Sequence, residues 1–193
     1  MMRILLACEM SGIGRQAFRS LGHDAWSCDV LPSMDNSPFH YQEDILTLLS
    51  KNWDWDLMIA HPPCTRLCVS GARWFKHYLL EQDAAINFVE RLWTAPILKI
   101  AIENPIGVLS TRSTLGKPTQ IIQPWEFGHE ETKATCLWLK NLPKLQSTEV
   151  MEFRWNTVHL EPPGLKNGFT RSQRRSMSYE GIAKAMAEQW SSP

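Results

Sequence analysis

The hydrophobic residues of this chain gather into short continuous runs, separated by stretches with a helical period. Four runs have the length and continuity of strands that are covered on both faces, at 3–8, 25–30, 55–60 and 97–102. Helical stripes lie between them, at 13–21, 46–51 and 78–94. This alternation predicts an α/β fold of the Rossmann-like class, with a mostly parallel sheet and helices on both faces.

The second half of the chain is less regular. Apolar runs at 119–123 and 135–139 predict two further strands. The segment 144–176 has little periodicity and several Pro and Gly residues, so we expect it to be rich in loops. A closing helix is predicted at 178–190, with Ser178 as its N-cap. A chain of 193 residues suits one domain.

The amino-acid composition limits which partners and which cellular compartment we expect for this protein. Twenty basic and twenty acidic residues give a net charge of zero, so binding to nucleic acid requires a local patch. The apolar run at the N-terminus is too short for a signal peptide or a membrane span. Five cysteines without paired spacing favour a reducing compartment. Cys64 and Cys68 lack the second pair that a metal site requires, so we expect no metal. The short apolar run leads us to expect no membrane contact either.

Reactive residues stand where the predicted strands end. Cys64 closes the motif His61-Pro62-Pro63-Cys64 after one strand, and Glu103 follows another. The carboxyl ends of parallel strands meet at one edge of a sheet, where α/β proteins bind their ligands. A cysteine at that edge can attack an electron-poor ring while a carboxylic acid polarises the ring. Acids also follow the earlier strands, at Glu9, Asp29 and Asp44.

In this order, these residues resemble the DNA cytosine-5 methyltransferases, especially small phage-type members of that family. The likeness covers most of residues 3–140 and, more weakly, the final helix. It rests on the turn from Cys8 to Gly14, Asp29, Glu43-Asp44-Ile45, Pro63-Cys64 and Glu103-Asn104. The family's Gln-x-Arg-x-Arg segment has no clean match, and its nearest counterpart here contains Lys133. The resemblance implies one methyltransferase domain over 1–193, a monomer in the cytoplasm of a bacterial or phage-infected host cell.

The resemblance implies S-adenosylmethionine as the methyl donor, lying over the first strands. Asp29 would accept both ribose hydroxyls, and Asp44 would accept from the adenine amino group. The residues implied in cofactor binding are Cys8, Glu9, Ser11, Gly12, Asp29, Val30, Asp44, Ile45 and Pro62. Two acids have an alternative interpretation, since Asp29 could simply start a turn and Asp44 could cap the next helix.

The resemblance also implies a covalent reaction on cytosine. The Cys64 thiolate would add to carbon-6 while Glu103 hydrogen-bonds the ring at N3 and the exocyclic amine. Asn104 would position Glu103 and the loop, and Lys133 would supply a charge. This chemistry requires a Cys64 pKa below the ~8.5 of a free thiol and a Glu103 pKa raised by a shielded site. Without Cys64, Glu103-Asn104-Pro105 would suit an ordinary turn after a strand.

DNA is the expected substrate, and a base in a duplex would have to leave the stack to react. The residues expected to contact it are Pro63, Arg66, Arg73, Arg171, Arg174 and Arg175. The basic cluster at 166–175 is also typical of a solvated segment, and 144–176 is shorter than the family's recognition region. Two alternatives therefore stay open: methylation of cytosine in RNA or in a free nucleotide, and a methyltransferase-fold protein that binds without catalysis.

Overall fold

A computed structural model describes residues 1–51, 54–157, 160–166 and 168–191. A seven-stranded sheet forms its centre, in the order β3-β2-β1-β4-β5-β7-β6. The strands are β1 (Arg3–Ala7), β2 (Asp24–Asp29), β3 (His40–Gln42), β4 (Leu57–Ala60), β5 (Lys99–Pro105), β6 (Gln120–Ile122) and β7 (Thr135–Lys140). Only β7 runs against its neighbours, so the expected α/β fold with a mostly parallel sheet is confirmed.

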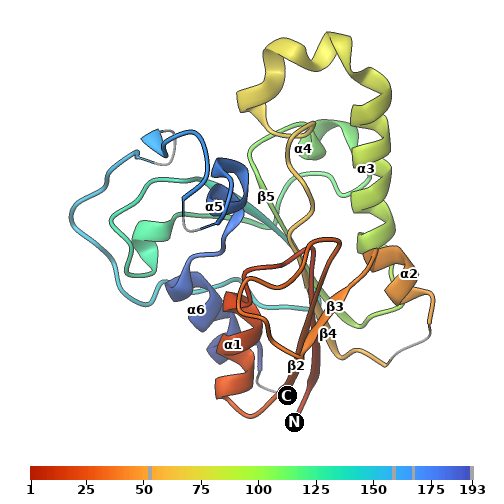
Figure 1. Ribbon diagram of the computed structural model, residues 1–193, viewed down its shortest axis with the longest axis vertical. Helices are drawn as coiled ribbons and strands as arrows, with labels where there is room; N and C mark the ends of the chain where they lie inside the picture. Colours follow the sequence, from red (N-terminus) through yellow and green to blue (C-terminus); the bar gives the residue numbers. More distant parts are fainter. Residues whose placement is uncertain (52–53, 158–159, 167, 192–193) are drawn as a thin grey trace.

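Helices cover both faces of this sheet (Figure 1). One face is covered by α1 (Ile13–Ser20) and α6 (Glu180–Trp190), which lie side by side. The other face is covered by α2 (Ile45–Leu49), α3 (Leu79–Trp93) and α4 (Leu109–Arg112). Because both faces are covered, all four residues of β4 are buried, and this explains why its sequence is a continuous apolar run.

Several short elements fall outside the predicted pattern. They are β3, α4, the 3₁₀ helices η1 (Val69–His77) and η2 (Pro124–Glu126), and α5 (Arg171–Ser176). The predicted cap at Ser178 is wrong, because α6 starts one residue later than expected and its N-cap is Tyr179, which makes no side-chain cap. Glu103 lies inside β5, where it pairs with Leu137 of β7, and does not follow the strand.

The described residues of the segment 144–176 are largely irregular, as expected, and lie beside the sheet. Backbone hydrogen bonds tie it to the body, including those from Gly128 N–H to the Glu149 carbonyl (2.8 Å) and from Thr132 N–H to the Trp155 carbonyl (2.7 Å). No helix in the described ranges is both long and apolar enough to cross a membrane.

Candidate active site

The turn after β1 is built around the buried carboxylate of Glu9. This carboxylate accepts from the Gly12 backbone N–H, at 2.9 and 3.1 Å to its two oxygens, and from the Ser11 hydroxyl. Gly12 precedes α1 with a φ of 81°, and Cys8 at the end of β1 has a φ of 56°. The Glu9 carboxylate therefore complements the positive end of the α1 dipole and places negative charge at the sheet edge.

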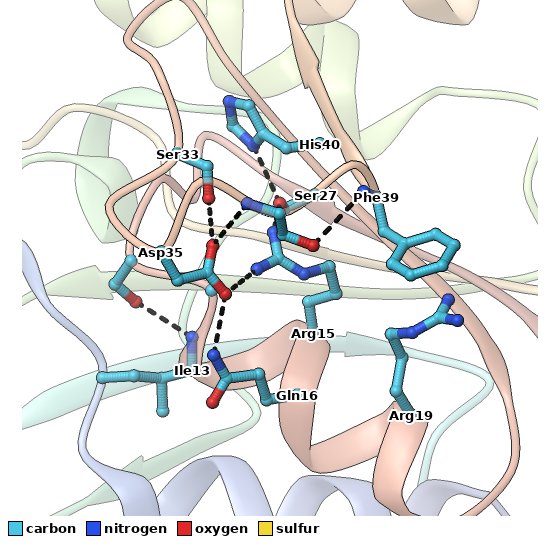
Figure 2. A network of polar contacts seen from close by, with 12 residues as sticks. Ile13, Arg15, Gln16, Arg19, Ser27, Ser33, Asp35, Phe39 and His40 are labelled. Atoms are coloured by element: carbon cyan, nitrogen blue, oxygen red, sulfur yellow. Dashed lines mark hydrogen bonds and ion pairs between the residues drawn. The ribbon is translucent and has the colours of Figure 1, made fainter.

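A second polar network, which sequence analysis did not predict, holds the loop after β2 against α1 (Figure 2). The Arg15 guanidinium is buried and donates to Asp35 and to the Ser27 hydroxyl. Ser27 also contacts Nδ1 of His40 at 2.8 Å, and Gln16 donates to Asp35 at 2.8 Å. Burial disfavours the Asp35 carboxylate, but its hydrogen bonds outweigh burial and hold the pKa of Asp35 well below its usual range.

Asp29 and Asp44 come together around Cys8. Burial raises the pKa of the Cys8 thiol, and the negative charges of both aspartates raise it further. Oδ1 of Asp29 accepts from the Leu31 N–H at 2.9 Å, which forms a turn. Oδ1 of Asp44 accepts from the first N–H groups of α2, at 2.8 and 3.1 Å. Asp44 thus caps α2, as the alternative interpretation holds, and these bonds leave Oδ2 of both aspartates for other partners.

The two apolar residues expected at the cofactor differ in exposure. Val30 follows β2 and is 65% exposed. Ile45 is the first residue of α2, is 4% exposed and packs into the core. Of these two residues, Val30 is therefore the one that offers apolar surface.

Glu103 is paired with His61 from the neighbouring strand. Nδ1 of His61 lies 2.6 Å from Oε2 of Glu103. Burial disfavours the Glu103 carboxylate, but the charge of His61 and its hydrogen bond outweigh burial, so the pKa of Glu103 lies below its usual range. Burial of His61 is outweighed in the same way by Glu103, and the pKa of His61 is raised. The expected rise in the Glu103 pKa is therefore wrong. The site is shielded from water, but the positive charge of His61 and its hydrogen bond together lower the pKa of Glu103 by more than burial raises it.

The loop that carries Cys64 is held against β5 and the residues after it. Nδ2 of the buried Asn104 donates to the Pro62 carbonyl at 2.9 Å. Further along, the Val108 N–H donates to the Leu67 carbonyl at 2.9 Å. Pro62 is buried and Pro63 is exposed. Asn104, a residue of β5, therefore holds the start of this loop in place.

The Cys64 thiol is half-buried. Burial and the neighbouring Cys68 raise its pKa, while the positive charges of Lys133 and Arg175 lower it by less. The net shift is upward. The expected fall in the Cys64 pKa is therefore wrong for this structure, because loss of hydration outweighs the two cations.

Lys133 lies close to Cys64, Glu103 and His61. Its ammonium donates to the Arg175 carbonyl at 3.1 Å and lies 5.4 Å from the centre of the Tyr179 ring. Its charge lowers the pKa of both Cys64 and Glu103. Lys133 thus lies within electrostatic range of two other expected catalytic side chains, Cys64 and Glu103.

A small cavity of about 20 Å³ adjoins this group, with room for about one water molecule. His61, Glu103 and Lys133 line it together with Tyr179, and the remaining wall includes side chains of α1 and α6. The His61–Glu103 pair therefore lies on the face of the sheet that α1 and α6 cover.

The basic residues expected at the substrate differ in what they contact. The Arg66 guanidinium lies 3.8 Å from the centre of the Tyr78 ring, and that of Arg73 lies 5.3 Å from the Trp74 ring. Arg175 is exposed and Arg171 is half-buried. Arg66 and Arg73 follow Cys64 by two and nine residues in the sequence, and Arg175 is the arginine whose charge acts on the thiol.

Arg174 is internal to its own segment. It forms an ion pair with Glu161 and donates to the carbonyls of Pro162, Gly164 and Phe169. Because these bonds occupy most of its donors, we assign Arg174 a structural role in place of the expected substrate contact.

Sequence analysis assigned no role to Arg15 or to His61. The position of His61 at a strand end was visible, but its pairing with Glu103 depends on β4 lying next to β5. Arg15 stands in the first turn of a helix, where a cation is unfavourable, and only the folded loop supplies its partner.

No family profile matches this sequence, and no curated protein is similar to it in sequence. Among solved structures, the chain is similar to an E. coli protein described as a candidate DNA modification methyltransferase encoded within a prophage. The TM-score is 0.52 at 13% sequence identity, over 86% of this chain and 56% of the other. The chain therefore spans little more than half the length of that protein. This similarity shows a shared fold.

Proposed function

We propose that this protein transfers a methyl group from S-adenosylmethionine to carbon-5 of cytosine in DNA, through a covalent adduct with Cys64. One observation carries the proposal: Cys64, Glu103 and Lys133 gather at the sheet edge that also holds the acids after β1 and β2. The description of the similar solved protein supports the class of reaction.

The edge formed by β1, β2 and β3 fits S-adenosylmethionine by the chemistry of its side chains. Glu9 offers a negative charge to the cofactor's ammonium group, and Oδ2 of Asp29 is available to the ribose hydroxyls. Val30 offers apolar surface to the adenine. The bound cofactor supplies the methyl group. Cys8, Ser11, Gly12, Asp44, Ile45 and Pro62 complete the proposed cofactor site, with Ile45 acting from the core.

Cys64 is the proposed nucleophile, and its sulfur forms a bond to carbon-6 of the ring. The ring's electron pair shifts toward N3 and carbon-5, and Glu103 hydrogen-bonds N3 and the exocyclic amine. Carbon-5 then accepts the methyl group, and loss of its proton lets the carbon–sulfur bond break. Lys133 and Arg175 favour the thiolate, because their positive charges lower the Cys64 pKa.

DNA is the proposed substrate because cations act on the thiol and further basic side chains follow it in the chain. Arg66 and Arg73 follow Cys64 in the chain, and the charge of Arg175 acts on the thiol. Guanidinium groups in these positions suit phosphate contacts, which orient a nucleic acid without reading its sequence. Pro63 and Arg171 would extend this surface.

Cytosine in RNA or in a free nucleotide is a second candidate substrate. Arg174 favours it, because this residue is used inside the segment 144–176 and not at its surface. A binding protein without catalysis is favoured by the raised pKa of Cys64, which keeps the thiol protonated at neutral pH.

The test is to express the protein in a host that lacks cytosine methylation and to measure 5-methylcytosine in its DNA by nucleoside mass spectrometry. Cys64→Ala is expected to abolish the signal, and Cys68→Ala, four residues away, is the matched control that retains it. Purified protein is then offered duplex DNA, RNA and dCMP. Methylation of RNA or dCMP alone would select the second candidate. Methylation by Cys64→Ala would refute the covalent reaction.

A further inference from the structure

Four charged side chains form a row along the edge of the sheet. Glu9 follows β1, His61 follows β4, Glu103 lies in β5 and Lys133 precedes β7. These strands are consecutive neighbours in the sheet, so the signs alternate from one strand to the next when His61 is protonated. The closest pair in this row is His61 and Glu103, whose side chains are 14% and 20% exposed.

We propose that His61 is a positioning residue for Glu103, and that the two side chains act as one couple that shares a proton. This inference rests on the proposed function. The contact of 2.6 Å between Nδ1 of His61 and Oε2 of Glu103 holds one carboxyl oxygen. It leaves Oε1 as the atom that meets the base. His61 thus determines which carboxyl oxygen of Glu103 faces the substrate and whether that carboxyl group is protonated.

The couple holds the same number of protons in two arrangements. In the first, His61 is an imidazolium and Glu103 a carboxylate. In the second, a water molecule in the cavity that both residues line has relayed the Nε2 proton to Oε1 of Glu103, and His61 keeps only its Nδ1 proton, which still bonds Oε2. As the sulfur of Cys64 bonds to carbon-6, the Oε1–H bond breaks and an N3–H bond forms. Glu103 returns to the carboxylate, and the ring gains one proton for the electron pair it received.

The surrounding charges act on this couple from every neighbouring strand. Glu103 and Glu9 favour the imidazolium, and Lys133 disfavours it. Tyr179, the residue before α6, lies near Glu103, whose charge contributes to a raised pKa of that phenol. The imidazolium keeps a proton available at a pH where a lone, ionised glutamate would have none to give.

The first experiment does not depend on turnover. NMR of protein labelled at its six histidines follows each imidazole against pH, and the His61 signal is identified by its loss in His61→Asn. We expect His61 to titrate above ~6.5 and at a lower pH in Glu103→Gln, because the carboxylate is removed. His77, which is exposed on η1, serves as the reference that does not change. An unchanged His61 titration in folded Glu103→Gln would refute the couple, whatever the protein catalyses.

The second experiment separates orientation from charge. Asparagine at 61 keeps an N–H donor near the position of Nδ1 but cannot titrate, and alanine removes both properties. We expect His61→Asn to lose about tenfold more methyl transfer at pH 8 than at pH 6, whereas His61→Ala loses it at both. Equal losses at both pH values in His61→Asn would reduce His61 to a structural residue. Thermal melting of each variant confirms that the protein is folded.

Discussion

Two glycines with the same backbone conformation allow the turn before α1 to be tested at a single residue. Gly12 and Gly22 have φ angles of 81° and 82°. A Cβ at Gly22 would meet no atom within 4 Å, whereas one at Gly12 would overlap Arg15 and lie 2.8 Å from Oδ2 of Asp35. We expect Gly22→Ala to lower the free energy of unfolding by about 1 kcal/mol. Gly12→Ala should lower it by about 1–3 kcal/mol more. Denaturant titration measures the free energy of unfolding of both variants. Equal losses would show that Arg15 and Asp35 can move to accommodate a Cβ at residue 12 without loss of stability.

The ionisation of Cys64 can be tested at the same scale through its alkylation rate. Burial and Cys68 raise the pKa of this thiol, and Lys133 lowers it. The thiolate is the reactive form, so alkylation by iodoacetamide should rise with pH and reach its midpoint above ~8.5. Lys133→Gln should move the midpoint to still higher pH, because the cation that favours the thiolate is gone. Trypsin cleaves after Arg66, so mass spectrometry separates the peptides of Cys64 and Cys68. A lower midpoint in Lys133→Gln would contradict the assigned geometry.

At the scale of an element, Asp44 caps α2 and is also proposed to bind the cofactor, and a pair of variants can separate the two roles. Its Oδ1 caps α2, a helix of five residues with few other bonds at its start. Asp44→Asn keeps a capping oxygen and removes the charge, whereas Asp44→Ala removes both. We expect only Asp44→Ala to lower stability, by ~1 kcal/mol. We expect both to weaken S-adenosylmethionine binding, measured by calorimetry. Unchanged cofactor affinity in Asp44→Asn would leave the cap as the sole role of this residue.

The same scale shows which elements sequence analysis could predict. The strands of the central sheet are buried on both faces, and burial enforces the continuous apolar run that predicted β4 and the start of β5. The three residues of β3 are all at least partly exposed, so no pattern marks them as a strand. The helix η1 has no buried residue and hence no stripe. Ser178 suits a cap by residue type, yet the chain places Tyr179 there, because tertiary packing sets the first turn of α6.

At the scale of the whole molecule, the candidate site depends on strand order, which periodicity does not reveal. Sequence analysis placed Cys64 and Glu103 at strand ends, and the parallel pairing of β4 with β5 brings those ends together. The wrong pKa directions of Cys64 and Glu103 have one cause. Each shift is a balance between burial and neighbouring charges: burial decides it at Cys64 and His61 decides it at Glu103, and both are known only once the fold is formed.

The charge distribution of the whole molecule predicts how the proposed binding to DNA would respond to salt. Because the net charge is zero, the affinity of such a complex would come from the few cations assigned to the substrate and not from a general field. The logarithm of the affinity should therefore fall with the logarithm of salt concentration by about 0.9 for each phosphate contacted. Arg66→Gln, Arg73→Gln and Arg175→Gln should each reduce that slope by about one contact, measured by fluorescence anisotropy on one duplex.

Lys184 provides the matched control, since it is 74% exposed on α6 and its nearest acid is Glu188 at 3.9 Å. Lys184→Gln makes the same change in net charge as the arginine variants, but at a surface away from Cys64. If affinity followed net charge alone, Lys184→Gln would lower the slope as much as Arg73→Gln does. A loss confined to the three arginines would instead place the phosphate backbone across the entrance to Cys64. That is where a cytosine must lie for its carbon-6 to reach the sulfur.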